Sequence, residues 1–426
     1  MSDWQQTTLG DLQTRVHRKV AVPPQGSRAS MSDWRQVSLA EVVTRVTTKN
    51  VDGTNQNVLT VSAEHGLISQ ESFFTKKVAS KDTSGYYIVG PGQFVYNKST
   101  SKSAAYGTVA RNLSNAPGIV SPLYLVFEAK DGAALPEYLE LALNSNQFFG
   151  SLAGMLREGA RSHGLLNVRL KEFYAATVTL PPASVQERIV KVIGALDAQI
   201  TALDAEAEAL DEVYRGFLLS LGARYGEVKI SEVVSRAFAG GTPSRSNSQF
   251  YGGDIPWLKS GEVENDSIVT ASEFITEAGL QGSSAKMVPP GATVVAMYGQ
   301  GDTKGRAGFV DAPISTNQAV LALVPDESLV LPRFLLHAVR SKTDDLRHRA
   351  VGSSQPNLSK GLVVTQTIPM PDSLADQKQA LAAIDSVRAN QAATRAEADR
   401  LREARPTLLS SLLDRTIDIE STELEV

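Results

Sequence analysis

The sequence predicts an α+β protein: two β-rich domains with short helices, separated by two long antiparallel helices. Three observations support this class. Segments of the chain repeat in the same order at a spacing of about 190 residues. Two stretches place apolar residues at alternating steps of four and three, as helices do when they pack lengthwise. Short apolar runs bounded by Gly, Pro, Asn and Asp are typical of strands. We therefore expect one unit, a globular domain followed by a long helix, to occur twice with a pseudo-two-fold relation.

The internal repeat sets the predicted domain boundaries, because self-similarity at a fixed period indicates a repeated structural unit. Three pairs of segments match in order: WRQVSLAEVVTR (34–45) with YGEVKISEVVSR (225–236), PEYLELALNS (136–145) with PRFLLHAVRS (332–341), and NVRLKEFYAATVTLPP (167–182) with NLSKGLVVTQTIPMPD (357–372). The predicted segments are an N-terminal extension at 1–30, a first domain at 31–182, a first long helix at 183–222, a second domain at 223–371, a second long helix at 372–413 and an acidic tail at 414–426.

The N-terminal extension carries a second, shorter repeat. MSDWQQTTLGDLQTRV (1–16) resembles MSDWRQVSLAEVVTRV (31–46), and a linker rich in Pro, Gly and Ser lies between them. We interpret residues 1–30 as a loosely attached segment that arose from an upstream start codon or a duplicated end. A scar of recombination between related genes is an alternative interpretation.

Strands are predicted in both domains from apolar runs between turn-forming residues. The candidate strands are YYIVG (86–90), QFVYN (93–97), LYLVFE (123–128), ATVVAMY (292–298) and AVLALV (319–324).

Each long helix has a seam of residues at heptad spacing that must be buried against another surface. In the first helix the seam contains Ile189, Ile193, Leu196, Ile200, Leu203, Ala207, Leu210, Tyr214, Phe217 and Leu221. In the second it contains Ala380, Ile384, Val387, Gln391, Thr394, Ala398, Leu401, Arg405, Leu408 and Leu412. We expect the two seams to pair antiparallel; the alternative is that each helix packs only on its own domain. Pro406 is expected to kink the second helix or to limit its last turn.

The length of these helices suggests a spacer. About 36 helical residues extend about 54 Å, which is comparable to one to two turns of B-DNA at about 34 Å each. Two related binding modules at such a spacing would suit a target of two half-sites with a gap between them.

Composition excludes several classes of protein. The chain has no cysteine, and its five histidines show no metal-ligand spacing. No apolar run approaches the roughly 20 residues of a membrane span, and the N-terminus lacks the apolar core of a signal peptide, so we expect a cytoplasmic protein. The net charge of −4 argues against a non-specific binder of polyanions. The acidity is concentrated in the first long helix and the tail, which leaves room for a basic face elsewhere.

Several segments together resemble one family. They are GGTPSRSNSQFYGGDIPWLKSGEV (240–263), PPGATVVAMYGQGDTKGRAGFV (289–310), STNQAVLALV (315–324), PGQFVYNKSTSKSAAYGTV (91–109), LPPASVQERIVKVIGALDAQI (180–200) and MPDSLADQKQALAAID (370–385). In this order they resemble the target recognition domains and spacer junctions of the DNA specificity (S) subunit of Type I restriction–modification systems. The resemblance covers nearly all of residues 31–413.

The resemblance implies a non-catalytic DNA-binding subunit that contains no cofactor of its own. In that family two target recognition domains each read one half of an asymmetric, bipartite sequence in double-stranded DNA. The spacer helices set the gap and dock two modification subunits, which bring S-adenosylmethionine and methylate adenine. Restriction subunits are a further implied partner, and they bring ATP and Mg²⁺.

Motifs of stand-alone enzymes are missing from the sequence. No Asn/Asp-Pro-Pro-aromatic tetrapeptide of an amino-methyltransferase occurs, and residues 180–183 are Leu-Pro-Pro-Ala. GQGDTKGR (299–306) meets the spacing of neither a P-loop nor GxGxxG, and no GxSxG is present. Two alternatives nevertheless stay open: a coiled-coil scaffold with two protein-interaction modules, and a nuclease or modification enzyme that acts alone.

The predicted DNA contacts are polar or basic side chains in loops that adjoin strands. Arginine can bond guanine or phosphate with two N–H groups, glutamine can pair with adenine, and lysine neutralises phosphates. In the second domain the candidates are Thr242, Ser244, Arg245, Lys259, Ser260, Tyr298, Gln300, Lys304, Arg306, Asn317 and Gln318. In the first domain they are Lys76, Lys77, Tyr96, Asn97, Lys98, Ser99, Lys102 and Arg111.

For some of these segments a structural role competes with DNA contact. Trp257 is expected to anchor its loop in the core, and Asn317 and Gln318 could equally serve the turn that contains them. GGTPSR itself either approaches phosphate closely or supports the domain structure. Because the loops of the two domains differ, we expect two different half-site sequences.

Overall fold

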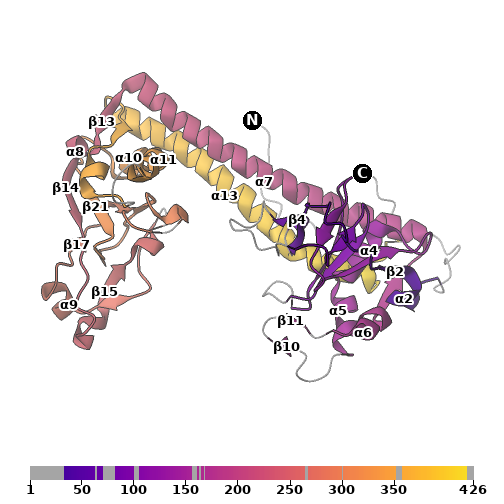
Figure 1. Cartoon of the computed structure of the whole chain (residues 1–426). Coiled ribbons are helices and arrows are strands. Elements are labelled where there is room, and N and C mark those ends of the chain that lie inside the picture. Colours follow the sequence, from indigo (N-terminus) through magenta and orange to yellow (C-terminus); the bar gives the residue numbers. More distant parts are fainter. Residues whose placement is uncertain are drawn as a thin grey trace. The chain divides into compact units, whose positions relative to one another are not determined.

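A computed structural model describes residues 33–62, 65–70, 82–99, 105–155, 161–162, 165–166, 168–263, 267–299, 301–351 and 357–419. The chain divides into two compact units: unit 1 comprises residues 1–198 and 401–426, and unit 2 comprises residues 199–400. Each unit contains part of both long helices, α7 (Ala183–Tyr225) and α13 (Leu374–Leu413) (Figure 1). The N-terminal extension and the end of the acidic tail lie outside the described residues.

Unit 1 consists of short strands and helices before α7. Their bounds are β1 Arg35–Ser38, α2 Leu39–Val42, β2 Val43–Val46, β3 Leu59–Ser62, β4 Gly66–Ser69, β5 Tyr87–Val89, β6 Phe94–Asn97, β7 Thr108–Arg111, β8 Gly118–Val120, β9 Leu125–Ala129, α4 Pro136–Leu143, α5 Asn146–Ala153, β10 Arg161–Ser162, β11 Leu165–Leu166, α6 Leu170–Ala175 and β12 Thr177–Leu180.

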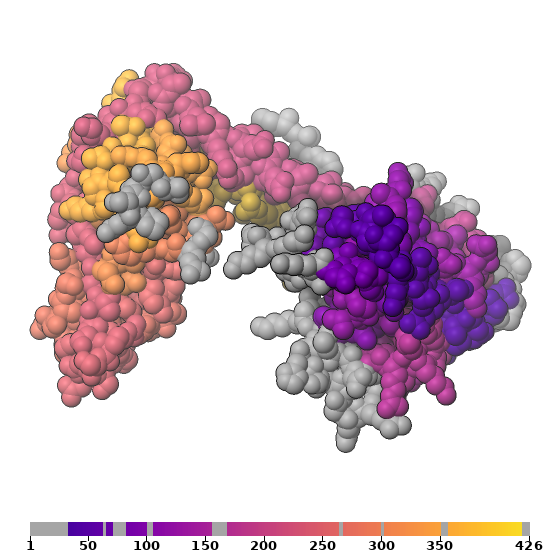
Figure 2. Space-filling view, in the orientation of Figure 1, coloured from indigo at the N-terminus to yellow at the C-terminus, as the bar shows by residue number. Residues whose placement is uncertain are grey.

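Unit 2 contains the corresponding elements between α7 and α13. Their bounds are β13 Glu227–Lys229, α8 Ile230–Val233, β14 Val234–Ala239, η1 Ser248–Phe250, β15 Tyr251–Leu258, η2 Ser260–Glu262, β16 Phe274–Ile275, α9 Glu277–Gln281, β17 Met287–Val288, β18 Thr293–Ala296, η3 Gly301–Thr303, β19 Ala307–Phe309, β20 Ile314–Thr316, β21 Val320–Pro325, α10 Pro332–Arg340, α11 Thr343–Val351, α12 Lys360–Val364 and β22 Thr367–Pro369. Figure 2 shows the atoms of unit 2, coloured from pink to yellow along the sequence in the space-filling view.

The two units share one topology. A four-stranded antiparallel sheet has the order β2-β9-β6-β7 in unit 1 and β14-β21-β18-β19 in unit 2, and a separate strand pair is β1-β12 in one and β13-β22 in the other. Strand β5 pairs with β8 as β17 pairs with β20, both antiparallel. The predicted fold class is confirmed, and all five predicted strands lie at β5, β6, β9, β18 and β21.

The junction between helices is built in the same way in both units. Helices α4 and α10 begin with Pro136 and Pro332, where a missing N–H costs nothing. The residue before each proline donates its N–H to a buried glutamine at the start of a long helix. Leu135 donates to Gln186 at 2.9 Å, and Leu331 donates to Gln377 at 2.8 Å. These bonds satisfy a helix-terminal donor away from water.

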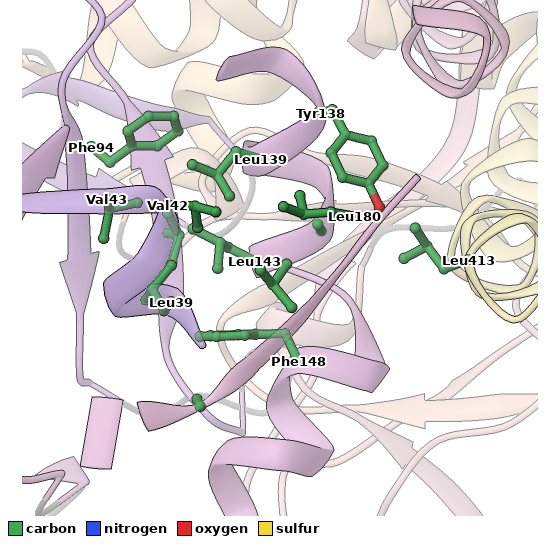
Figure 3. Close-up of a cluster of buried hydrophobic side chains, with 14 of the residues drawn as sticks. Leu39, Val42, Val43, Phe94, Tyr138, Leu139, Leu143, Phe148, Leu180 and Leu413 are labelled. Atoms are coloured by element: carbon green, nitrogen blue, oxygen red, sulfur yellow. The ribbon is translucent and has the colours of Figure 1, made fainter. Parts of the chain in front are cut away.

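The core of unit 1 forms where α4, α5 and the sheet meet the start of α7 and the end of α13. Figure 3 shows Phe94, Tyr138, Phe148 and Leu180 among its buried side chains, with Leu413 of α13 at its edge. Unit 2 has an equivalent core, to which α7 contributes Leu218 and Leu221 and α13 contributes Ala380 and Ile384.

Helix α13 continues through Pro406 to Leu413, so the proline does not end it. None of the helices within the described ranges is long and apolar enough to cross a membrane.

Candidate nucleic-acid interface

The loop after β14 begins with a glycine pair that packs against neighbouring backbone. A Cβ atom at Gly240 would lie 2.0 Å from the Thr316 carbonyl oxygen, and one at Gly241 would lie 2.3 Å from Ser284. Glycine avoids both clashes because it has no Cβ. The Gly241 carbonyl accepts a hydrogen bond from the indole N–H of Trp257 at 3.0 Å. This geometry favours the structural interpretation of the glycines. It also confirms Trp257 as a core anchor, since the side chain is 2% exposed.

Arg245 lies in the same loop, and its side chain contacts a group of charged and aromatic side chains. This group is here called the Glu273 cluster (Arg245, Tyr251, Trp257, Lys259 and Glu273). Arg245 donates from Nη1 to Oε1 of Glu273 and from Nη2 to Oε2 at 3.0 Å. Its guanidinium carbon lies 4.4 Å from the ring centre of Tyr251 and 5.1 Å from that of Trp257. Lys259 Nζ lies 3.5 Å from Glu273 Oε2. The Arg245 side chain remains 57% exposed, so part of it is open to solvent.

The electrostatics of this cluster favour a fixed charge pair. Hydrogen bonds from Arg245, and then the charges of Arg245 and Lys259, hold the pKa of Glu273 below its ordinary value. The bond to Glu273 in turn raises the pKa of Arg245. Glu273 therefore orients a planar donor group that is suited to bonding guanine or phosphate. Glu273 was missed in the sequence because 28 residues separate it from Arg245.

The remaining candidates of unit 2 lie around this cluster and in the β18–β19 hairpin loop. The hydroxyl of Thr242 donates to the side-chain carbonyl of Gln318, which ties the loop after β14 to the turn after β20. Asn317 accepts the N–H of Ala319 at 3.1 Å, so it serves that turn. Gln300 lies outside the described residues. The exposed or half-buried candidates of unit 2 are Thr242, Ser244, Arg245, Lys259, Ser260, Tyr298, Lys304, Arg306, Asn317 and Gln318.

In unit 1 the prediction that Tyr96 contacts DNA is wrong. Its side chain is fully buried, stacks on Phe173 with ring centres 4.6 Å apart, and donates its hydroxyl to the Tyr106 carbonyl at 2.7 Å. Burial raises the pKa of this phenol. Strand β6 is covered on both faces, since Tyr96 and Val95 belong to different apolar clusters. A run of apolar residues alone does not reveal that arrangement.

Arg111 is also placed differently from the prediction. Its Nη1 lies 2.6 Å from Glu137, its Nε lies 3.3 Å from Glu140, and its side chain is only 14% exposed. These ion pairs join β7 to α4, which corrects the prediction of an open phosphate contact.

The other candidates of unit 1 lie at the start of the β6–β7 loop. Asn97 accepts the N–H of Ser99 at 2.9 Å, Lys98 is half-buried and Ser99 is exposed. Lys76, Lys77 and Lys102 lie outside the described residues.

The predicted burial of the helix seams is confirmed. The predicted interface positions are all buried or half-buried: Ile189, Ile193, Leu196, Ile200, Leu203, Leu210, Ile384, Val387, Leu401 and Leu408. The outer parts of the seams pack into the cores of the two units, while polar residues join the helices directly.

Two polar contacts mark the direct pairing of α7 with α13. In unit 2 the buried Gln391 donates to the Ala207 carbonyl at 2.9 Å. In unit 1 Arg405 forms a two-point ion pair with Asp197, at 2.5 and 2.8 Å. The helices therefore pack on each other as well as on the domains, and the alternative that each packs only on its own domain is wrong.

The described part of the chain contains no group of three or more His, Cys, Asp or Glu residues that could hold a metal ion. The candidate residues instead form a set of polar and basic side chains held on loops, and such a set suits binding to nucleic acid.

Comparison with known proteins gives a consistent result. Residues 224–402 match the family model described as the Type I restriction modification DNA specificity domain. The chain is 25% identical over 196 residues to the EcoR124I/EcoR124II specificity subunit of Escherichia coli, which covers 44% of this chain and 48% of that protein. It is 26% identical over 157 residues to the MjaIX specificity subunit of Methanocaldococcus jannaschii, which covers 36% of this chain and 35% of that one. The matched part is thus about half the length of these relatives or less.

One solved structure shows the same fold over nearly the whole chain. That structure comes from a study of complex assembly and conformational transition of the type I R-M system. It matches with a TM-score of 0.59 and 18% identity, over 91% of this chain and 99% of that one.

Proposed function

We propose that this chain is the sequence-specific DNA-binding subunit of a Type I restriction–modification complex, on the basis of its similarity to specificity subunits of such systems. Unit 1 and unit 2 each read one half of an asymmetric, bipartite sequence in double-stranded DNA. The long helices set the gap between the half-sites and dock two modification subunits.

One observation supports this proposal above the others: the two units share a topology but differ in the loops that carry their polar side chains. The loop after β14 presents Arg245 within the Glu273 cluster, and the β18–β19 loop presents Tyr298 and Lys304. The β6–β7 loop of unit 1 presents Lys98 and Ser99 instead. A common frame with unlike loops suits two different half-site sequences, because base contacts specify and backbone contacts position.

Catalysis is assigned to the partner subunits. The modification subunits are expected to bind S-adenosylmethionine and to methylate adenine, and restriction subunits are expected to bring ATP and Mg²⁺. The contribution of this chain is to select the DNA sequence and to hold the complex on it.

The test is to compare DNA methylation in cells that express this chain with its modification partner and in cells that express the partner alone. We expect methyladenine only with both proteins, in a split motif with two unlike halves and a fixed gap. Exchanging residues 223–371 for those of a relative should change one half of the motif and leave the other unchanged.

A stable complex without new methylation would contradict the proposal and favour a scaffold with two protein-interaction modules. Turnover by the isolated chain would favour an enzyme that acts alone. A control chain that lacks the ion pair of Arg333 with Asp311, neither of which is a candidate DNA contact, should methylate the same motif.

A further inference from the structure

The β18–β19 hairpin loop lies beside a cavity of about 670 Å³ in unit 2. Arg306 and Ala307 of the hairpin line this cavity together with Thr343, Asp344 and Arg347 of α11. Close apolar packing normally fixes a backbone in place. Because a hollow adjoins this loop, its position depends more heavily on hydrogen bonds.

One arginine of α11 supplies such bonds. Arg347 donates from Nε to the Lys304 carbonyl at 2.9 Å and from Nη2 to the Asp302 carbonyl. Its Nη1 donates to Asp344, one turn earlier in the same helix, at 3.2 Å. One rigid guanidinium therefore fixes two loop carbonyls at once, which a lysine ammonium on a flexible stem does less well.

Unit 1 contains an equivalent position. Helix α5 buries Phe148 and Leu152, and α11 buries Leu346 and Ala350 at the same spacing of four residues. Phe148 of α5 therefore corresponds to Leu346 of α11. The residue that follows each of them is also equivalent, so Phe149 of α5 corresponds to Arg347 of α11.

The equivalent side chains contact the same point of their loops. The ring of Phe149 stacks on Tyr106 with centres 6.0 Å apart. Tyr106 precedes Gly107 as Lys304 precedes Gly305, and both glycines have φ of +82°, in the left-handed region. An aromatic stack thus occupies in unit 1 the place of the arginine–carbonyl contact in unit 2.

We propose that Phe149 and Arg347 are positioning residues for sequence readout, each acting on the hairpin loop of its own unit. This inference rests on the proposed function. Neither side chain has to touch DNA. Each holds a backbone segment from which candidate contacts project, such as Lys304 in unit 2, and readout is sharper when these side chains are fixed before DNA arrives.

The experiment uses the full chain in complex with its modification partner and measures affinity for three duplexes: fully matched, mismatched in the first half and mismatched in the second half. Arg347→Ala is expected to reduce discrimination against second-half mismatches about tenfold and to leave first-half discrimination unchanged. Phe149→Ala is expected to give the converse result. Arg347→Lys should remain defective; full recovery by this variant would show that charge alone suffices and would overturn the proposal.

Arg349→Ala is the matched control. Arg349 lies on the same helix, but its guanidinium bonds Gln366 at 2.8 Å and the Leu362 carbonyl at 3.3 Å instead of the loop. We expect this variant to show no selective loss in either half. Equal behaviour of the Arg347→Ala and Arg349→Ala variants would overturn the positioning role.

A second measurement separates this inference from the proposed function. Hydrogen exchange of the loop amides at 301–306, measured without DNA, should be about tenfold faster in Arg347→Ala than in Arg349→Ala. Unchanged exchange would overturn the positioning role whatever the DNA result. A wild-type complex without any sequence preference would instead overturn the proposed function, and with it the readout role.

Discussion

The two units build one topology from different core side chains. In unit 1 the central strand β6 contributes Phe94 and Tyr96, and Tyr96 stacks on Phe173 of α6. At the equivalent positions of β18, unit 2 has Thr293 and Val295, and its core is mainly aliphatic. Cores tolerate such exchange when volume and pattern are kept. The difference teaches that strand register and helix junctions, more than the identity of core residues, specify this fold.

The junction glutamines support the same conclusion, because the residue at the junction is the same in both units although the core residues differ. Gln186 and Gln377 occupy equivalent places and are 4% and 1% exposed. Each accepts the N–H of the residue before a proline, and each donates its amide to a backbone carbonyl at 2.8 or 2.9 Å. Apolar side chains can replace one another, whereas a buried N–H needs a specific acceptor.

The largest expected effect tests the contrast between the cores. Phe173→Ala should destabilise unit 1 by about 3–5 kcal/mol, because the ring contacts Tyr96, Phe127 and Phe148. Its equivalent in α12, Val363, is also fully buried, and Val363→Ala should destabilise unit 2 by about 1–3 kcal/mol. Hydrogen exchange resolved along the chain would assign each loss to its unit.

Leu113→Ala is the control for this pair, since Leu113 is 74% exposed and should change little. Equal losses for the Phe173 and Val363 variants would break the comparison, because they would mean that the rings add nothing beyond ordinary apolar burial.

Replacing the junction glutamines should lower stability by the same amount in the two units. Gln186→Ala and Gln377→Ala each leave a buried N–H without its acceptor, so each should cost about 1–3 kcal/mol in its own unit. Hydrogen exchange of the backbone amides at the start of α4 and α10 would measure the loss of stability in each unit. A large loss in only one unit would contradict the equivalence of the two junctions.

The features that were predictable from the sequence depend on local or periodic patterns. The repeat and the burial of the heptad seams follow from residue spacing, whereas the burial of Trp257 follows from its large aromatic side chain; the structure shows the shared topology and the burial. Tyr96 and Arg111 were misplaced because the burial of a strand on two faces and an ion pair to a later helix are not encoded locally. Glu273 and Arg347 were missed for the same reason, since 28 and 43 residues separate them from their partners.

A smaller effect should distinguish base contacts from phosphate contacts. Arg245→Ala should weaken binding about tenfold and reduce discrimination in the second half, because it removes the oriented guanidinium of the Glu273 cluster. Lys98→Ala should weaken binding to all sequences a few-fold and lower the slope of log affinity against log salt by about 1. Titrations of matched and mismatched duplexes at several salt concentrations would measure both changes.

Arg245→Lys is the control for the first of these variants, since it keeps the charge and loses the planar donor pair. If the lysine variant discriminated as well as the wild type, Arg245 would act as a charge only, and the contrast between the loops of the two units would lose its basis.

The smallest expected effect concerns pH, and it again contrasts the units. In unit 2 Lys342 and Thr367 donate to Glu227, each at 2.6 Å, and these bonds, with the charge of Lys342, hold the pKa of Glu227 below its ordinary value of 4.5. Because the folded state lowers this pKa, the ionised carboxylate stabilises the fold above about pH 4.5, and the stabilisation is lost as pH falls through the folded-state pKa. At the equivalent position of β1, unit 1 has the uncharged Gln36.

Glu227→Gln should therefore make unit 2 resemble unit 1. Since the carboxylate is 33% exposed, solvent screening limits the expected loss to about 0.5–1 kcal/mol near neutral pH. The difference from the wild type should shrink toward zero as pH falls through the lowered folded-state pKa, because the wild-type carboxylate then becomes protonated itself. Denaturant unfolding at several pH values would measure it, with Gln36→Glu as the control, because Gln36 is exposed and a carboxylate there has no such lysine. A loss that persisted undiminished at acid pH would show that Glu227 acts through packing or neutral hydrogen bonds, and the charge difference between the units would then not affect their stability.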